Sequence, residues 1–228
     1  MLRGARLNHL FQQAVSAHKI TAYDYIWDLC CDHGFLGQAF LHRFETGNKP
    51  HIVFVDQHKH ITEPLKDSLR RFSAERFTVL SNDARRIQLQ GNNRHLLIIA
   101  GVGGELCIEI IKCIQSQHSN LSIDFLICPT NSMFFVRQQL QSLPLKLCSE
   151  LIIKEGKWFY QLLLLKEDDE LKPSNKISCV GNMWDKKNTE HLLYLQRLIQ
   201  HYQNKVKSQP SAEEALEAYQ ALYTKLVS

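Results

Sequence analysis

Short apolar runs alternate with longer stretches of helical periodicity between residues 25 and 171. Such alternation is typical of a parallel sheet with helices on its faces. The apolar runs predict strands at Tyr25–Leu29, His51–Val55, Phe77–Leu80, Leu96–Ala100 and Ile123–Cys128. Apolar residues spaced by three and four positions predict helices at Phe35–Phe44, Ile61–Phe72, Glu105–Ser116 and Met133–Leu143. The pattern therefore predicts five consecutive strand–helix units.

The pattern changes after residue 144. Two extended apolar runs, Leu145–Ile153 and Lys157–Lys166, are separated by only three residues and predict an antiparallel hairpin. A sheet of five parallel units that ends in a hairpin differs from the dinucleotide-binding Rossmann sheet, which continues to a sixth parallel strand. The predicted fold is α/β, with a seven-stranded Rossmann-like sheet that resembles the class I methyltransferase fold.

The last part of the chain predicts a separate helical unit. Residues 183–228 carry two apolar stripes at helical spacing, separated by Pro210, which predicts a helical hairpin. Ser211 and Glu214 form a capping-box pattern at the start of its second helix. The polar stretch Lys166–Lys176 is the predicted linker. We therefore expect two domains: residues 1–171, which include an N-terminal helix, and residues 172–228.

Composition excludes several classes of protein. Hydrophobic residues make up 44% of the 228 positions and charged residues 22%, as in a soluble globular chain, and no apolar run approaches the roughly 18 residues of a membrane span. The seven cysteines include no C-x-x-C pair, which favours reduced thiols in a cytoplasm. None of the eleven histidines has metal-ligand spacing, so we expect no metal site. The net charge of +4 permits a polyanionic partner without requiring one.

Polar residues and glycines follow all five predicted strands, where ligands of an open parallel sheet bind. Each alone is more often a turn or a helix cap. Asp56 differs, because an acid after the second strand can accept hydrogen bonds from both hydroxyls of a ribose, and we favour this reading over a helix cap. Asp28 suits a ligand amino group or, equally, nearby backbone amides. Asn82 or Asp83 suits the amine of an adenine.

Two glycine-containing loops complete this ligand description. Backbone N–H groups near Gly34 suit a carboxylate, and Gly101, Gly103 and Gly104 predict a wall that something approaches closely, in preference to a plain turn. A ribose, an adenine, an amino group and a carboxylate together describe S-adenosylmethionine.

Four sequence strings resemble a known family. They are Asp28-Leu-Cys-Cys-Asp32-His33-Gly34-Phe-Leu, Ile98-Ile-Ala-Gly101-Val-Gly103-Gly104, Pro129-Thr-Asn131 and Glu155-Gly-Lys157-Trp-Phe-Tyr160. They are similar to elements of the bacterial tRNA adenine-22 N1-methyltransferase family, over a range from about residue 6 to residue 166. The resemblance implies methyl transfer from S-adenosylmethionine to N1 of an adenine in tRNA.

Carried over by position, the resemblance assigns site residues. Asp32 and Asn131 are expected to act on the target base. The expected cofactor contacts are Asp28, Cys30, His33, Gly34, Asp56, Gln57, Asn82, Asp83, Ala100, Gly101, Gly103 and Gly104. The chain departs from the family pattern at Cys30, Cys31, Gly37 and Ala100, where the family has Gly, Ser, Pro and Cys. The missing glycine at Cys30 puts full activity in doubt.

Drawing a base out of folded RNA requires binding energy away from the reacting atoms, and cations near the two chain ends are suited to supply it. The candidates are Arg3, Arg6, Lys186, Lys187, Arg197, Lys205 and Lys207, each of which also suits a plain solvated helix face. Two alternatives stay open: a methyltransferase-like module that binds nucleic acid or a partner without turnover, and a methyltransferase with a substrate other than tRNA. The sequence leaves monomer and weak homodimer equally open.

Overall fold

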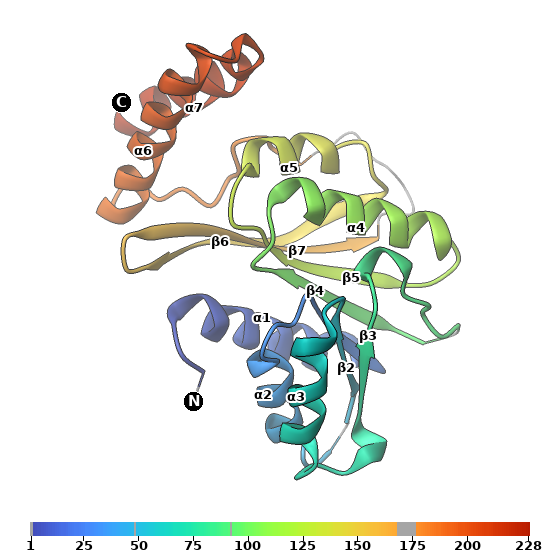
Figure 1. Cartoon of the computed structure of the whole chain (residues 1–228). Coiled ribbons are helices and arrows are strands. Elements are labelled where there is room, and N and C mark those ends of the chain that lie inside the picture. The colour runs from blue at the N-terminus through green and yellow to red at the C-terminus, as the bar shows by residue number, and fades with distance from the viewer. Residues whose placement is uncertain (1, 48, 92, 168–176) are drawn as a thin grey trace.

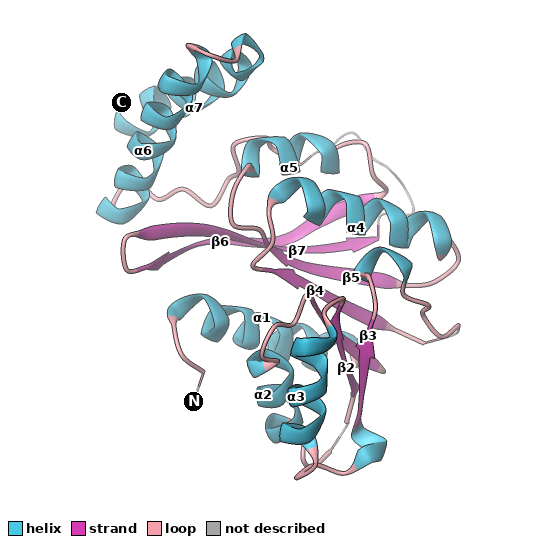
Figure 2. Ribbon diagram, in the orientation of Figure 1, coloured by secondary structure: helices cyan, strands magenta, loops and turns pink. Residues whose placement is uncertain are grey.

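The computed structural model describes residues 2–47, 49–91, 93–167 and 177–228, and it contains one seven-stranded sheet (Figures 1 and 2). The strand order is β3-β2-β1-β4-β5-β7-β6. The strands are β1 (Tyr25–Leu29), β2 (His51–Asp56), β3 (Phe77–Ser81), β4 (His95–Ala100), β5 (Ile123–Cys128), β6 (Leu145–Glu155) and β7 (Trp158–Glu167). The helices are α1 (Ala5–Thr21), α2 (Phe35–Arg43), α3 (Lys59–Leu69), α4 (Gly104–Gln117), α5 (Met133–Leu140), α6 (Thr189–Val206) and α7 (Glu213–Val227).

Helices cover both faces of the sheet, because successive side chains of each strand point to opposite faces and both kinds are apolar. On one face, Ile26 and Leu96 pack in the core formed with α1, α2 and α3. On the other, Trp27 and Leu97 pack in the core formed with α4 and α5. Figure 1 shows these two layers below and above the sheet. The expected α/β fold is confirmed.

The predicted hairpin is confirmed as well. Strand β7 runs antiparallel to both β5 and β6, while β1 to β5 pair in parallel. The tip of the hairpin contacts both the N-terminal helix and the C-terminal helices. Glu155 accepts a hydrogen bond from the backbone N–H of Arg6 at 2.8 Å, and Lys154 forms a 2.7 Å ion pair with Glu190 of α6.

The C-terminal helices form the predicted helical hairpin, which packs on α5 through Phe134 against Leu195, Tyr202 and Tyr219. The predicted capping box is wrong. Ser211 lies inside a 3-10 turn, Pro210–Ala212, whereas an N-cap residue needs a non-helical backbone. Helix α7 starts after this turn without a side-chain cap.

A buried arginine ties the C-terminal segment to the sheet. Arg137 of α5 has no exposed surface and donates to Gln161 at 2.9 Å and to the carbonyl of Ser178 at 3.2 Å. Its guanidinium also forms an ion pair with Glu150 of β6. These contacts hold the segment around Ser178 against α5 and the sheet. The expected linker and the domain boundary at residue 171 lie almost entirely outside the described residues.

Three further observations concern the expectations from composition. No helix among the described residues is both long and apolar enough to cross a bilayer. The seven cysteines, all of which lie in the described ranges, form no disulfide bond with one another. Within the described ranges, no group of three or more His, Cys, Asp or Glu side chains is placed to hold a metal ion.

Candidate functional site

Left-handed backbone conformations gather at the carboxyl ends of the central strands. In the loop after β1, Cys30 has φ 55°, Asp32 has φ 49° and Gly34 has φ 65°, and Gly101 after β4 has φ 82°. Ser132, after β5, has φ 58°. Strain of this kind costs about 1–3 kcal/mol at each non-glycine residue and tends to gather at functional sites. The loops that the sequence singled out therefore meet at one strained edge of the sheet.

A cavity of about 230 Å³, here called the strand-end cavity, lies at this edge. The ends of β1, β2 and β3 and the first turns of α4 form its wall. The lining residues are Cys30, Val55, Asp56, Gln57, His58, Asn82, Asp83, Ala84, Arg85, Val102, Leu106 and Ile110. It unites five of the predicted cofactor contacts, namely Cys30, Asp56, Gln57, Asn82 and Asp83. Pockets for whole drug-sized ligands usually measure about 300–1,000 Å³, so this one suits part of a larger ligand.

Asp56 is the buried carboxylate of the strand-end cavity, with 8% of its surface exposed. Its Oδ1 accepts hydrogen bonds from the backbone N–H of His58 at 3.0 Å and interacts with the His58 ring at 3.1 Å. Among the described residues, its Oδ2 has one long contact, 3.4 Å from the backbone nitrogen of Asp32. Helix α3 begins at Lys59, and its N-cap residue, His58, has no side-chain cap bond, so the Asp56 carboxylate binds the N–H that precedes the helix and does not cap it.

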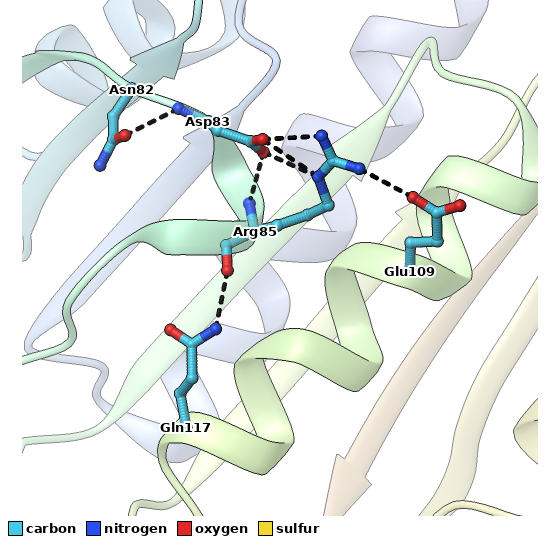
Figure 3. A network of polar contacts seen from close by, with 5 residues as sticks. All are labelled: Asn82, Asp83, Arg85, Glu109 and Gln117. Atoms are coloured by element: carbon cyan, nitrogen blue, oxygen red, sulfur yellow. Dashed lines mark hydrogen bonds and ion pairs between the residues drawn. The ribbon is translucent and has the colours of Figure 1, made fainter.

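Asp83 is held by an arginine that the sequence analysis did not single out (Figure 3). The Arg85 guanidinium contacts both carboxylate oxygens of Asp83, at 2.7 to 3.1 Å, and donates to Glu109 of α4 at 3.0 Å. This hydrogen bonding lowers the pKa of the Asp83 carboxyl. Asp83 is thus held in place as an anion, and both of its carboxylate oxygens accept hydrogen bonds from Arg85. The neighbouring Asn82 is exposed and lines the cavity.

Asp28 lies below the loop, 6% exposed, and accepts a 3.0 Å hydrogen bond from the backbone N–H of Gly37 in α2. Burial raises the pKa of its carboxyl to about 7. Of the two roles predicted for Asp28, the structure shows the hydrogen bond to a nearby backbone amide. Gly37 also has a structural reason to depart from the family proline, because a Cβ there would lie 2.2 Å from the Phe54 ring.

The rest of the first loop lies outside the strand-end cavity. Asp32 and His33 are exposed and contact each other, with Oδ1 and Nδ1 2.9 Å apart, and the His33 ring stacks on Phe35 at 5.5 Å. Gly34 donates its own N–H to the carbonyl of Cys31 at 2.8 Å. That N–H is therefore used within the loop, and carboxylate binding by the other N–H groups near Gly34 stays a prediction.

The glycine corner, defined as Gly101, Gly103 and Gly104, faces the loop that follows β5. Gly104 donates its N–H to Oδ1 of Asn131 at 3.1 Å, and a Cβ at Gly104 would lie 2.9 Å from the Asn131 carbonyl oxygen. The close approach at Gly104 is therefore to protein backbone, which by itself accounts for glycine at this position, and the predicted cofactor contact there stays a prediction. Gly101 is open, and its positive φ is the reason it favours glycine. Ala100 is half-buried at the end of β4.

The predicted RNA-binding cations differ in their local contacts. Arg6 stacks over the Tyr160 ring at 5.0 Å, and a Cβ at Gly101 would lie 3.9 Å from its Nη2, so Arg6 lies beside the glycine corner. Arg197 stacks over Phe159 at 5.3 Å, and Lys205 lies over the Tyr202 ring. The remaining candidates, Arg3, Lys186, Lys187 and Lys207, are exposed.

A larger cavity of about 500 Å³, here called the hairpin cavity, lies between the loop after β5, the tip of the β6–β7 hairpin and the C-terminal helices. It begins at Asn131 and Tyr160, and Tyr194, Tyr202 and Tyr219 line its other side. The sequence analysis placed Tyr202 and Tyr219 in helix stripes and did not foresee a cavity. Its walls come from segments far apart in the chain, so no local sequence pattern predicts this cavity.

Comparison with known proteins gives one family and a shared fold. A family model described as a methyltransferase domain matches residues 10–163. A search of curated proteins found no match.

Several solved structures share the fold over nearly the whole chain. A Streptococcus pneumoniae protein described as a putative tRNA (m1A22) methyltransferase, in complex with S-adenosyl-L-methionine, has 16% identity and a TM-score of 0.72, with 96% of this chain and 98% of that chain covered. TrmK of M. capricolum, in complex with S-adenosyl-homocysteine, has 16% identity and a TM-score of 0.72 over 98% of each chain. The m1A22 tRNA methyltransferase TrmK of B. subtilis has 16% identity and a TM-score of 0.71, covering 99% and 97%. At this identity the likeness shows the fold.

Proposed function

The chain belongs to the methyltransferase-domain family, and we propose that it transfers a methyl group from S-adenosylmethionine to N1 of an adenine in tRNA. The observation that carries the proposal is the buried Asp56 carboxylate, which lines the strand-end cavity at the end of β2. The solved structures that share the fold include ones described with this cofactor or its product, and ones described as tRNA methyltransferases. They support the proposal.

The residues of the strand-end cavity fit the nucleoside part of the cofactor. Asp56 offers acceptor positions for ribose hydroxyls, since Oδ2 has only its long contact to Asp32. Val102, Leu106 and Ile110 supply an apolar wall for an adenine ring, and the exposed Asn82 amide lies at its edge. When bound there, S-adenosylmethionine supplies an electrophilic methyl group on a sulfonium.

The glycine corner suits the amino-acid part. The Arg6 guanidinium lies beside the open Gly101, and its Nε is buried without a hydrogen-bond partner among the described residues. A carboxylate is the usual partner of such a guanidinium, because the charge-assisted hydrogen bonds are strong. Arg6, first expected to contact RNA, is thus assigned to the cofactor carboxylate. Asp28 positions α2 by holding the Gly37 N–H.

The main task of this chain in the reaction is to orient the adenine N1 toward the methyl group. Adenine N1 carries a free lone pair, so no proton has to be removed before it attacks the methyl group. Asn131, whose Oδ1 is fixed by Gly104, keeps its Nδ2 available to hold the base edge. Asp32, exposed in the loop after β1, is the carboxylate assigned to stabilise the positive charge that develops on the base.

A module that binds without turnover is the second candidate, and one observation favours it. Cys30 places a side chain in the strand-end cavity at a backbone position with φ 55°, where the family resemblance has glycine. The cysteine is inert, because burial, with the nearby acids, raises the pKa of its thiol to about 11. Its sulfur therefore only narrows the cavity.

The test is transfer of a labelled methyl group to tRNA from cells that lack this protein, followed by mass mapping of the nucleosides. We expect 1-methyladenosine, and at least about tenfold less of it with Asn131→Ala. Asn204→Ala, an exposed position on α6, is the matched control and should leave the yield unchanged. Cofactor binding without label in tRNA would support the second candidate, or a substrate other than tRNA if label enters another molecule.

A further inference from the structure

Aromatic side chains dominate the wall of the hairpin cavity. They are Trp158, Phe159 and Tyr160 from β7, Tyr194 and Tyr202 from α6, and Tyr219 from α7. Phe159 and Tyr194 stack on each other at 4.9 Å, while Trp158 is 61% exposed. A large exposed indole in an aromatic lining suits a flat ring better than a flexible chain.

Two cationic side chains, Lys157 and Arg197, line this cavity. Lys157 lies over the Trp158 ring at 5.1 Å, and Arg197 lies over Phe159 at 5.3 Å while donating to the Lys157 carbonyl at 2.7 Å. Within the cavity lining, the structure shows no carboxylate. An aromatic cavity with a cationic rim matches a nucleotide, in which a planar base is attached to an anionic backbone.

A buried hydroxyl supplies an independent observation. Tyr219 is fully buried where it borders the cavity, and its hydroxyl has no hydrogen-bond partner among the described residues. Burying an unpaired hydroxyl is destabilising, and such exceptions call for an explanation. Burial raises the pKa of the Tyr219 hydroxyl, so it remains a neutral donor and acceptor. A heteroaromatic ring with nitrogen and oxygen atoms at its edge would satisfy it.

The walls are held in place by the sheet. Gln161 of β7 donates to the Tyr194 hydroxyl at 3.3 Å and accepts from the buried Arg137 at 2.9 Å. At the other side of the cavity, Asn131 is fixed by the Gly104 N–H. The cavity therefore borders the glycine corner through Asn131, and the C-terminal helices form its far wall.

We infer that the hairpin cavity binds a nucleobase that the RNA substrate extrudes from its stack, with Trp158 as the stacking surface and Tyr219 as a hydrogen-bonding group. The inference rests on the proposed function only in taking RNA as the substrate. Extruding a base costs a few kcal/mol, and stacking on a protein ring returns part of this energy. The C-terminal helices then act as half of a base-binding site, besides any contact with the RNA backbone.

The test uses the full chain and a short single-stranded RNA with one 2-aminopurine, whose fluorescence is quenched when it stacks. We expect quenching by the parent protein. Trp158→Ala should weaken binding at least about fivefold. Tyr219→Phe should weaken it about two- to tenfold while leaving the unfolding midpoint unchanged or higher, because the unpaired hydroxyl is gone.

Tyr223→Phe is the matched control, since Tyr223 lies on the same helix outside the hairpin cavity and its hydroxyl contacts Gln196. It should bind the probe as the parent does, and titration with S-adenosylmethionine should give the parent's value in all three variants. Absence of quenching by the parent, or parent-like binding by both Trp158→Ala and Tyr219→Phe, overturns the inference. Methyl transfer to tRNA without quenching contradicts this inference alone, whereas quenching without methyl transfer contradicts only the proposed function.

Discussion

Cys30 shows how a single residue carries both a structural cost and a functional question. A left-handed backbone is unfavourable for any side chain with a Cβ by roughly 1–2 kcal/mol, yet Cys30 adopts φ 55° and lines the strand-end cavity. The loop therefore adopts at Cys30 a conformation that glycine would adopt without this cost. The sequence alone located the loop and showed that Cys30 departs from the family pattern. It could not show the backbone conformation at Cys30, which is set by hydrogen bonds such as that from the Cys31 N–H to the Val55 carbonyl.

We predict that Cys30→Gly is more stable than Cys30→Ala by about 1 kcal/mol, although glycine normally destabilises relative to alanine. Both variants remove the sulfur, so their difference reports the backbone alone. Urea unfolding of the two variants measures it. Equal stability, or a more stable alanine variant, would show that the loop does not hold this conformation in solution.

Asp28 provides a pH-dependent prediction. Its pKa is about 7 in the folded protein against 3.8 for an ordinary carboxyl, mainly because of burial. Between these values the folded state binds more protons than the unfolded state, so this group lowers stability as pH rises from about 4 to about 7. Asp28→Asn removes the effect. Its unfolding free energy should gain on the parent's by up to about 1.4 kcal/mol per pH unit in that range.

The measurement is denaturant unfolding of the ligand-free proteins at several pH values from 5 to 8. Asp67→Asn serves as control, because Asp67 is exposed on α3 and pairs only with Arg70. Its difference from the parent should not follow the Asp28→Asn slope. A constant difference between Asp28→Asn and the parent would mean that Asp28 is already ionised throughout the range.

Among the elements, strands and helices were predictable because the apolar period changes from one to the other, and predicted strand bounds agree with observed ones to within one residue, with one exception. The exception is β6, which extends two residues further, to Glu155. The capping box failed because Pro210 starts a 3-10 turn that absorbs Ser211. The anchoring of the C-terminal unit by Arg137 was not predictable, since its partners lie in β6, β7 and the segment before α6.

We predict that Arg137→Ala destabilises the protein by about 3–5 kcal/mol, because it leaves Glu150, whose side chain is 10% exposed, and the buried Gln161 without their cationic partner. Arg70→Ala is the matched control, since Arg70 is exposed and forms only a surface pair with Asp67, and its effect should stay within about 0.5 kcal/mol. Denaturant unfolding measures both. An Arg137→Ala variant as stable as Arg70→Ala would remove the anchoring role.

For the molecule as a whole, the sequence located the edge of the sheet that carries the site, because ligands of such sheets bind at the carboxyl ends of the strands. The resemblance carried by its motifs is confirmed at the level of fold by structures of the same description. Side-chain relations across the molecule were beyond it. Arg85 joins Asp83 to Glu109 of α4, and Arg6 reaches the glycine corner from the first helix, so each arginine contacts a residue remote in the chain.

The central claim is that the strand-end cavity holds the ribose of S-adenosylmethionine through Asp56. Calorimetric titration of the full chain with this cofactor tests it, using Asp56→Ala and, as matched control, Asp67→Ala on the surface of α3. We predict one site per chain in the parent and in Asp67→Ala, and about 10- to 150-fold weaker binding in Asp56→Ala, the loss expected for hydrogen bonds to a charged group. No binding by the parent, or equal binding by Asp56→Ala, would contradict the account.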